Sequence, residues 1–187
     1  MEITYIVNEK AGREPLKILT DFMRTLPAVV KYGKTILYEG ETVYLPYLSA
    51  VYEIVQTKEK YTFICSCTSR DIAVLSGQRL TEVSINRTDA DDDSICPVSR
   101  TESDVLEEIE TQIKLDPGIR KTAKNYHMNL ISTGRVYLRE TVFYAKGRKN
   151  YIFPVDPLQE KVDFQNAGAV NRHIAEIFVR QHPEILK

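Results

Sequence analysis

Tryptophan is absent from this chain of 187 residues. The chain also lacks an apolar run of about 18 residues, the length that a membrane-spanning helix needs. The first residues, Met1 to Thr4, also lack the basic and apolar regions of a secretory signal. With 43% apolar and 27% charged residues, the composition is neither fibrous nor disordered. We therefore expect a globular, cytoplasmic protein without a membrane span, folded as a single domain over residues 1–187.

Cysteine is scarce, and its three copies, Cys65, Cys67 and Cys96, cannot all pair within one chain. This odd number argues against a disulfide scaffold and favours a reducing compartment. Alternation along a strand would place the sulfurs of Cys65 and Cys67 on one face, but two ligands do not make a zinc site. We predict buried, apolar cysteines.

Neither sign of charge dominates, because 25 Lys and Arg residues face 26 Asp and Glu residues, and no overall field draws the chain to a polyanion. Binding of nucleic acid would need a local patch. Two basic stretches with tyrosine neighbours, 120–126 and 146–151, are the candidates. Their charged residues are Arg120, Lys121, Lys124, Lys146, Arg148 and Lys149. Nucleic-acid or polyanion binding is therefore one alternative function.

Catalytic signatures are missing: the chain has no nucleophile elbow, no glycine-rich phosphate loop and no His-Glu zinc helix. Gly33-Lys34-Thr35 has the end of a phosphate loop, but Ala28 stands where the earlier glycine is needed. We predict no cofactor. An enzyme whose site is assembled from distant segments remains an alternative. Its possible participants are His127, His173, His182, Asp156 and the cysteines.

Aspartates alternate at Asp89, Asp91 and Asp93, where their carboxylates could converge on a hard cation as in the first part of a calcium loop. The rest of that pattern is wrong, because Ser94 stands at the glycine position and Arg100 at the position of the bidentate glutamate. A solvated acidic loop without metal is the prediction, with the three aspartates as the only candidate ligands.

Hydrophobic periodicity in the first half predicts a strand at 1–8, a helix at 14–26 and an antiparallel meander from Val29 to Cys67. Turn residues divide this meander at Gly33, at 39–41 and at 57–60. A proline cannot donate to a strand ladder, so Pro46 indicates that its strand is an edge strand or is bulged there.

The second half begins with a strand at 81–86 and a polar loop at 87–100. A helical pattern covers 102–127 and is stopped or bent at Asp116-Pro117-Gly118. A hairpin at 135–155 and a last helix at 167–181 follow. The whole pattern predicts an α+β fold, in which a mainly antiparallel, Tyr-rich sheet packs with three to four helices.

The two hairpin regions resemble each other, because Val43-Tyr44-Leu45 matches Val136-Tyr137-Leu138 at an offset of 93 residues and Tyr61-Thr62-Phe63 matches Tyr151-Ile152-Phe153 at an offset of 90. This predicts an internal pseudo-repeat of 29–86 and 128–165. The alternative is that two Tyr-rich hairpins look alike because they obey the same β preferences.

Eleven tyrosines gather mainly in the predicted strands. A tyrosine offers a large contact area with a polar tip, so such a sheet face is typical of an interaction surface, although a half-buried sheet with aromatic pairs fits as well. The leading hypothesis is a non-catalytic protein–protein interaction or assembly component, acting through this face or through an exposed strand edge and binding another protein or a second copy of itself. The predicted interaction residues are Tyr44, Tyr47, Tyr52 and Tyr61.

Overall fold

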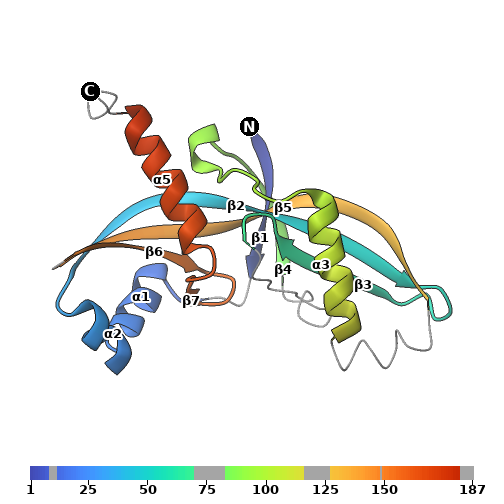
Figure 1. Ribbon diagram of the computed structural model, residues 1–187, viewed down its shortest axis with the longest axis horizontal. Helices are drawn as coiled ribbons and strands as arrows, with labels where there is room; N and C mark the ends of the chain where they lie inside the picture. The colour runs from blue at the N-terminus through green and yellow to red at the C-terminus, as the bar shows by residue number, and fades with distance from the viewer. Residues whose placement is uncertain (9–11, 70–82, 116–126, 148, 182–187) are drawn as a thin grey trace.

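The computed structural model describes residues 1–187 except 9–11, 70–82, 116–126, 148 and 182–187 (Figure 1). A large, mostly antiparallel sheet packs with four α-helices in this part of the chain, which confirms the α+β fold class. No helix among these residues combines the length and the apolar composition that crossing a bilayer requires.

Two strands of nineteen residues each, β2 (Ile36–Ile54) and β5 (Met128–Lys146), pair antiparallel along their whole length. In Figure 1 this ribbon runs across the width of the molecule. Leu45 lies opposite Leu138 near its middle. The turn expected at 39–41 is wrong: β2 continues through these residues with an irregularity in register between Glu39 and Thr42, where the backbone at Gly40 lies against the ring of Tyr144.

The other strands flank this ribbon, and β1 lies inside the sheet between β5 and β4, parallel to the first and antiparallel to the second. Their order in the sheet is β3-β2-β5-β1-β4, with β6 paired to β5 and β7 to β6. Their bounds are β1 (Glu2–Asn8), β3 (Lys60–Ser66), β4 (Val83–Asp89), β6 (Asn150–Asp156) and β7 (Lys161–Val162).

The helices cover separate parts of the sheet (Figure 1). At one end α1 and α2 pack on Phe143 and Phe153, and α3 packs near the other end on Ala50 and Phe63. Residues of α5 pack on Leu45 and its neighbours in the middle of the ribbon. The bounds are α1 (Pro15–Met23), α2 (Leu26–Tyr32), α3 (Glu102–Leu115) and α5 (Ala167–Gln181), with a 3₁₀ turn, η2, at Asp92–Ser94.

The expectation that a strand begins at Val29 is wrong, because α2 occupies this segment. Pro27 stands in its first turn, where the fixed φ of proline suits a helix. Ala28 and Tyr32, four residues apart, are buried on one side, and Gly33 ends the helix with φ +66°. Helical spacing of these two side chains therefore prevails over the β preference of the valines between them.

Pro46 does not mark an edge strand or a bulge, since β2 lies between β3 and β5 and the register opposite Tyr137 is regular there. The carbonyl oxygen of Pro46 accepts a hydrogen bond from the Cys67 N–H at 2.9 Å. The N–H and C=O groups of one residue point the same way across a strand. The N–H group that Pro46 lacks would therefore point toward the end of β3 at Ser66, beyond the paired residues of β2 and β3, so its absence removes no hydrogen bond between these strands.

The strands at the two ends of the ribbon have matching dimensions. β3 and β6 have seven residues each and the same sequence of exposed, half-buried and buried positions. Leu45 and Leu138, which match at the offset of 93, are also cross-strand partners. The helices do not follow this offset, because a shift of 90 residues places α5 on 77–91, which contains β4. The pseudo-repeat stays a prediction.

Candidate functional site

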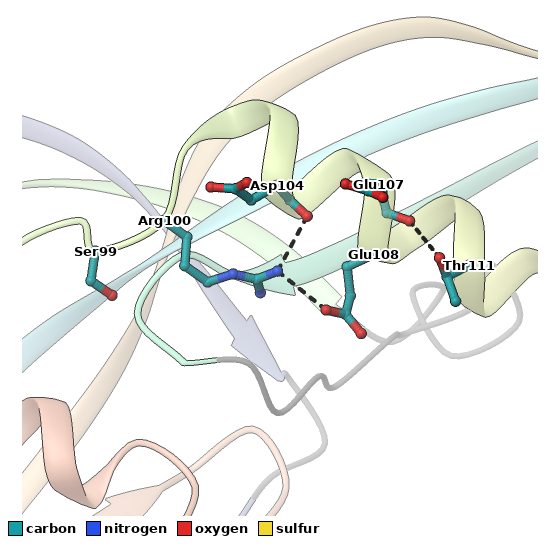
Figure 2. A pocket seen from close by; sticks show the side chains of 6 residues that line it. All are labelled: Ser99, Arg100, Asp104, Glu107, Glu108 and Thr111. Carbon is teal, nitrogen blue, oxygen red and sulfur yellow. Dashed lines mark hydrogen bonds and ion pairs between the residues drawn. The ribbon is translucent and has the colours of Figure 1, made fainter.

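A polar pocket of about 490 Å³ lies between α3 and the segment that precedes it (Figure 2). Three of its six lining residues are acidic, and the full lining consists of Ser99, Arg100, Asp104, Glu107, Glu108 and Thr111. The guanidinium group of Arg100 points toward the helix, where it donates to the Asp104 carbonyl oxygen at 3.2 Å and to the Glu108 carboxylate at 3.3 Å.

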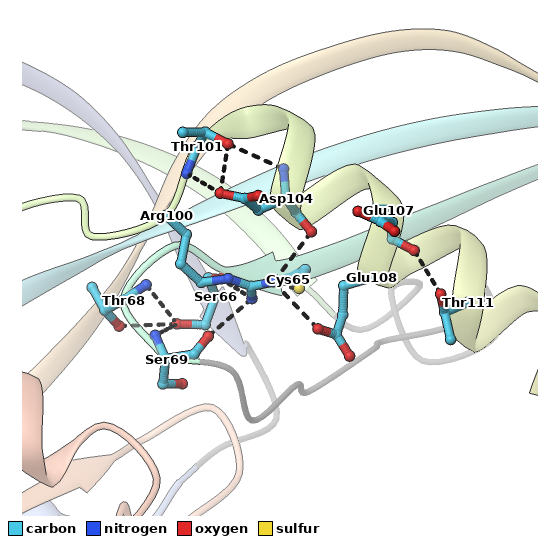
Figure 3. Close-up of polar contacts among 10 residues, drawn as sticks. All are labelled: Cys65, Ser66, Thr68, Ser69, Arg100, Thr101, Asp104, Glu107, Glu108 and Thr111. Carbon is cyan, nitrogen blue, oxygen red and sulfur yellow. Dashed lines mark hydrogen bonds and ion pairs between the residues drawn. The ribbon is translucent and has the colours of Figure 1, made fainter.

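Arg100 also ties α3 to the end of β3 (Figure 3). Its Nη1 donates to the carbonyl oxygens of Ser66 at 3.3 Å and Ser69 at 2.9 Å. Because four acceptors share one half-buried guanidinium, its hydrogen-bonding capacity is largely used inside the protein. Arg100 acts here as a structural clamp, and the cation of this pocket is not available to an incoming anion.

Cys65 of β3 and Cys67, just after the end of this strand, pack in the core cluster that α3 covers. Burial raises the pKa of the Cys65 thiol to about 11, although the nearby Arg100 lowers it. Burial likewise raises the pKa of Cys67, and that of Cys96 to about 12. All three thiols stay protonated near neutral pH, so none is an activated nucleophile.

A second polar feature is a buried network that attaches the start of α5 to the sheet. Asn166 donates through Nδ2 to the Tyr47 hydroxyl at 3.1 Å and to the Asp163 carboxylate at 2.7 Å. Its Oδ1 accepts hydrogen bonds from Thr68 Oγ1 at 2.9 Å and Ser66 Oγ at 3.3 Å. Asp163 also accepts the backbone N–H groups of Gln165 and Asn166. The network fixes the entry of α5 and satisfies its first polar groups.

Glu140 lies beside this network and is fully buried, and as a carboxylate it receives no hydrogen bond from a described residue, so that only its protonated form can bond, by donating to Asp163. Burial, and next the neighbouring carboxylate of Asp163, raise the pKa of Glu140 well above its usual range. Burial also raises the pKa of Asp156 to about 6. The part of the chain that the structure describes holds no group of three or more His, Cys, Asp or Glu side chains suited to a metal ion.

The four tyrosines predicted as interaction residues do not form one exposed surface. Tyr47 and Tyr52 are buried, and Tyr44 and Tyr61 are half-buried. The ring of Tyr52 packs edge-on against Phe63, and Tyr44 packs in the same way against Tyr5. Much of the tyrosine enrichment therefore goes into cross-strand aromatic packing.

The described members of the remaining predicted site residues fall in two separate segments of the chain. Asp89 ends β4, and Asp91 and Asp93 belong to the exposed segment around the 3₁₀ turn. Lys146 and Lys149 are exposed at the tip of the β5–β6 hairpin. Arg120, Lys121 and Lys124 lie outside the described residues, as do Arg148 and His182.

The histidines within the described residues do not meet either. His127 is exposed just before β5, whereas His173 is buried on α5 and donates from Nε2 to the carbonyl oxygen of Asp93 at 2.9 Å. Asp156 accepts the backbone N–H groups of Leu158 and Gln159, so its carboxylate stabilises a turn.

The feature that sequence reasoning missed is a free edge on β5. Residues 128–135 pair with β2 on one side, and no described strand pairs with them on the other. Asn129 to Arg135 are all exposed, including Leu130 at 42% and Ile131 at 51%. The Leu-Ile pair between polar neighbours was a weak signal for it, because the strand was expected to begin only at Arg135.

Neither the whole chain nor any part of it matches a known family model, and comparisons with curated proteins and with solved structures found no similar protein.

Proposed function

We propose that this protein is a non-catalytic assembly component that binds a second copy of itself through the free edge of β5 at residues 128–135. The observation that carries the proposal is a row of backbone N–H and C=O groups with none of the described strands beside it and with exposed apolar side chains on it. Such an edge is a template for pairing with another strand.

The composition of the edge supports pairing. Edge strands that avoid association carry lysine, proline or a bulge that bends the edge away. Residues 128–134 contain no charged residue and no proline. The segment does contain one irregularity, because its register with β2 shifts between Ser132 and Leu130, as the register of β2 also does between Glu39 and Thr42.

The charge pattern favours a second copy as the partner. Two identical edges meeting antiparallel place like residues symmetrically about a twofold axis, and like charges directly opposite would repel. Arg135 is the only charge between 128 and 135, and a pairing centred on this segment places it opposite Met128. Pairing of two copies along this segment therefore brings no like charges directly opposite each other.

The enzymatic alternative has less support, since the thiols are buried and protonated and the histidines and Asp156 serve structural roles or lie apart. Among the described residues, polyanion binding would rest on Lys146 and Lys149, which are exposed at the tip of the β5–β6 hairpin. Exposed lysines are common at hairpin tips, so these two residues give that alternative little support.

Light scattering coupled to size-exclusion chromatography, at low and high salt and with absorbance at 260 and 280 nm, tests the proposal. We expect a dimer without nucleic acid that high salt does not dissociate, because backbone and apolar contacts are little screened. The double substitution Leu130→Lys and Ile131→Lys should shift it to the monomer. Leu115→Lys, at a 63% exposed position at the end of α3, is the matched control and should leave the dimer intact.

A monomeric native protein at all concentrations and salts contradicts the proposal, and so does a dimer that the double substitution leaves unchanged. Nucleic acid in the low-salt peak alone would favour the hairpin tip instead.

A further inference from the structure

A second site of different chemistry lies where two strands separate along the outer side of β5. β1 pairs with β5 only at Tyr137 and Leu138, and β6 pairs with it only from Thr141 onward. Arg139 and Glu140 fall between the two. Because β1 and β6 leave β5 at this point, the sheet opens there into a fork.

The fork holds a pocket of about 320 Å³, a size typical of small-molecule sites. Its walls are mainly apolar and come from Ile6 and Val7 of β1, from Pro15 of α1 and from Pro157 and Leu158 after β6. The polar groups that line it include Arg139 and Thr141 of β5 and Asn86 of β4. An apolar pocket with a few convergent polar groups is the usual architecture of a ligand site.

Arg139 is the only positive charge in this lining, and its guanidinium has no ion pair or hydrogen bond with any described residue. Its neighbour Glu140 cannot neutralise it, because successive side chains of a strand point to opposite faces. Tyr44 is its cross-strand partner on β2. An unpaired guanidinium beside apolar walls suits a carboxylate, which it can bind in a bidentate way.

The wall opposite β1 is held in place by Asp156. Its Oδ1 accepts the backbone N–H groups of Leu158 at 2.7 Å and Gln159 at 3.2 Å, which fixes the turn that carries Pro157 and Leu158. Because Asp156 is buried at the end of β6, this turn is anchored to the sheet. The pocket is thus built by paired strands and a hydrogen-bonded turn.

We propose that the fork pocket binds a small carboxylate with a short apolar chain. The carboxylate pairs with the guanidinium of Arg139, and the chain lies against Ile6, Val7 and Leu158. This site lies on a different stretch of β5 from the edge at 128–135, so it does not depend on the proposed dimer.

Calorimetric titration with octanoate tests the proposal, with 1-octanol as the uncharged counterpart. We expect saturable binding of octanoate at one site per chain and at least tenfold weaker binding of octanol. Arg139→Gln should weaken octanoate binding at least tenfold. Arg87→Gln is the matched control, because Arg87 follows Asn86 on β4 and therefore points to the other face of the sheet. The affinity of this variant for octanoate should stay within twofold of that of the native protein.

A second variant, Val7→Trp, fills the apolar part of the pocket and leaves Arg139 in place. It should abolish octanoate binding, and the amide shifts that octanoate causes in the native protein should fall on residues of the fork. Absence of saturable binding to the folded native protein overturns the proposal. Equal affinity in the native protein and in a folded Arg139→Gln variant overturns it as well.

Discussion

Glu140 lies on the central strand β5, and its carboxyl group is buried close to those of Asp163 and Asp156. Burial and the nearby Asp163 raise the pKa of Glu140, so the folded protein holds this proton more tightly than the unfolded chain does. The free energy of unfolding therefore falls as the pH rises from the ordinary glutamate pKa toward the raised one. At low pH both states are protonated and this loss is absent.

We predict that Glu140→Gln is more stable than the native protein at pH 8, because its amide has no charged form to avoid; each unit by which the pKa of Glu140 is raised corresponds to about 1.4 kcal/mol. The two proteins should approach equal stability near pH 4, because glutamine has the shape of the protonated acid but cannot ionise. Urea unfolding at several pH values measures this. The exposed Glu107→Gln should change little at any pH. A native protein that is more stable than Glu140→Gln at pH 8 would show that the charged form of Glu140 is stabilised.

At the scale of single elements, Gly40 of β2 has no room for a side chain. A Cβ atom there would lie 2.3 Å from Tyr144 Cε2 and 3.0 Å from the Val142 carbonyl oxygen. We predict that Gly40→Ala lowers stability by about 1–3 kcal/mol, as overpacking does. Chemical denaturation measures the change.

Two further variants locate the cause. Gly12→Ala, at an exposed position before α1 and with no atom within 4 Å of the new Cβ, should change stability by less than about 0.5 kcal/mol. Tyr144→Leu should recover part of the loss in Gly40→Ala, so that the two substitutions are not additive. If the stability losses of Gly40→Ala and Tyr144→Leu are additive, the loss in Gly40→Ala comes from the strand backbone and not from the contact with Tyr144.

The attachment of α3 to β3 depends on Arg100, whose side chain is only 12% exposed. We predict that Arg100→Met lowers stability by about 2–3 kcal/mol, because three carbonyl groups and the Glu108 carboxylate lose a charged donor. Thermal or urea unfolding measures the loss. Lys17→Met, the same change of charge at an exposed position of α1, should be nearly neutral. If both variants lose the same stability, the change in net charge is responsible and not the hydrogen bonds of Arg100.

At the scale of the whole molecule, the two ends of β5 should differ in protection from hydrogen exchange. Residues 137–146 have strands on both sides over most of their length, whereas residues 129–135 have β2 on one side only among the described strands. Peptides from the two segments, compared by mass spectrometry at a concentration that favours the monomer, should exchange at different rates, with 129–135 faster. In the proposed dimer 129–135 should slow down. Equal protection in the monomer would mean that the free edge is covered.

Local patterns were sufficient for most elements. The last helix was predicted at 167–181 with the observed bounds, and the first strand and the second strand of the second hairpin lie close to where they were predicted. The start of β5 at Met128 was missed, because this strand was expected to begin at Arg135. Two further errors lie at 29–32 and at 39–41, where burial of Tyr32 and the contact between Gly40 and Tyr144 overrule the local preferences. Both depend on partners more than 100 residues away, such as Tyr151 beside Tyr32.

The sequence by itself determined the fold class, the apolar role of the cysteines and the absence of familiar catalytic motifs, because these depend on composition, spacing and periodicity. Only the tertiary structure decided which tyrosines are buried, which side of β5 is free and where β1 and β6 separate to leave Arg139 in a pocket. Strand order and register bring together residues as distant as Ile6, Asn86 and Leu158. No local pattern contains that information, because pairing between distant strands is fixed by how all the apolar faces are buried at once.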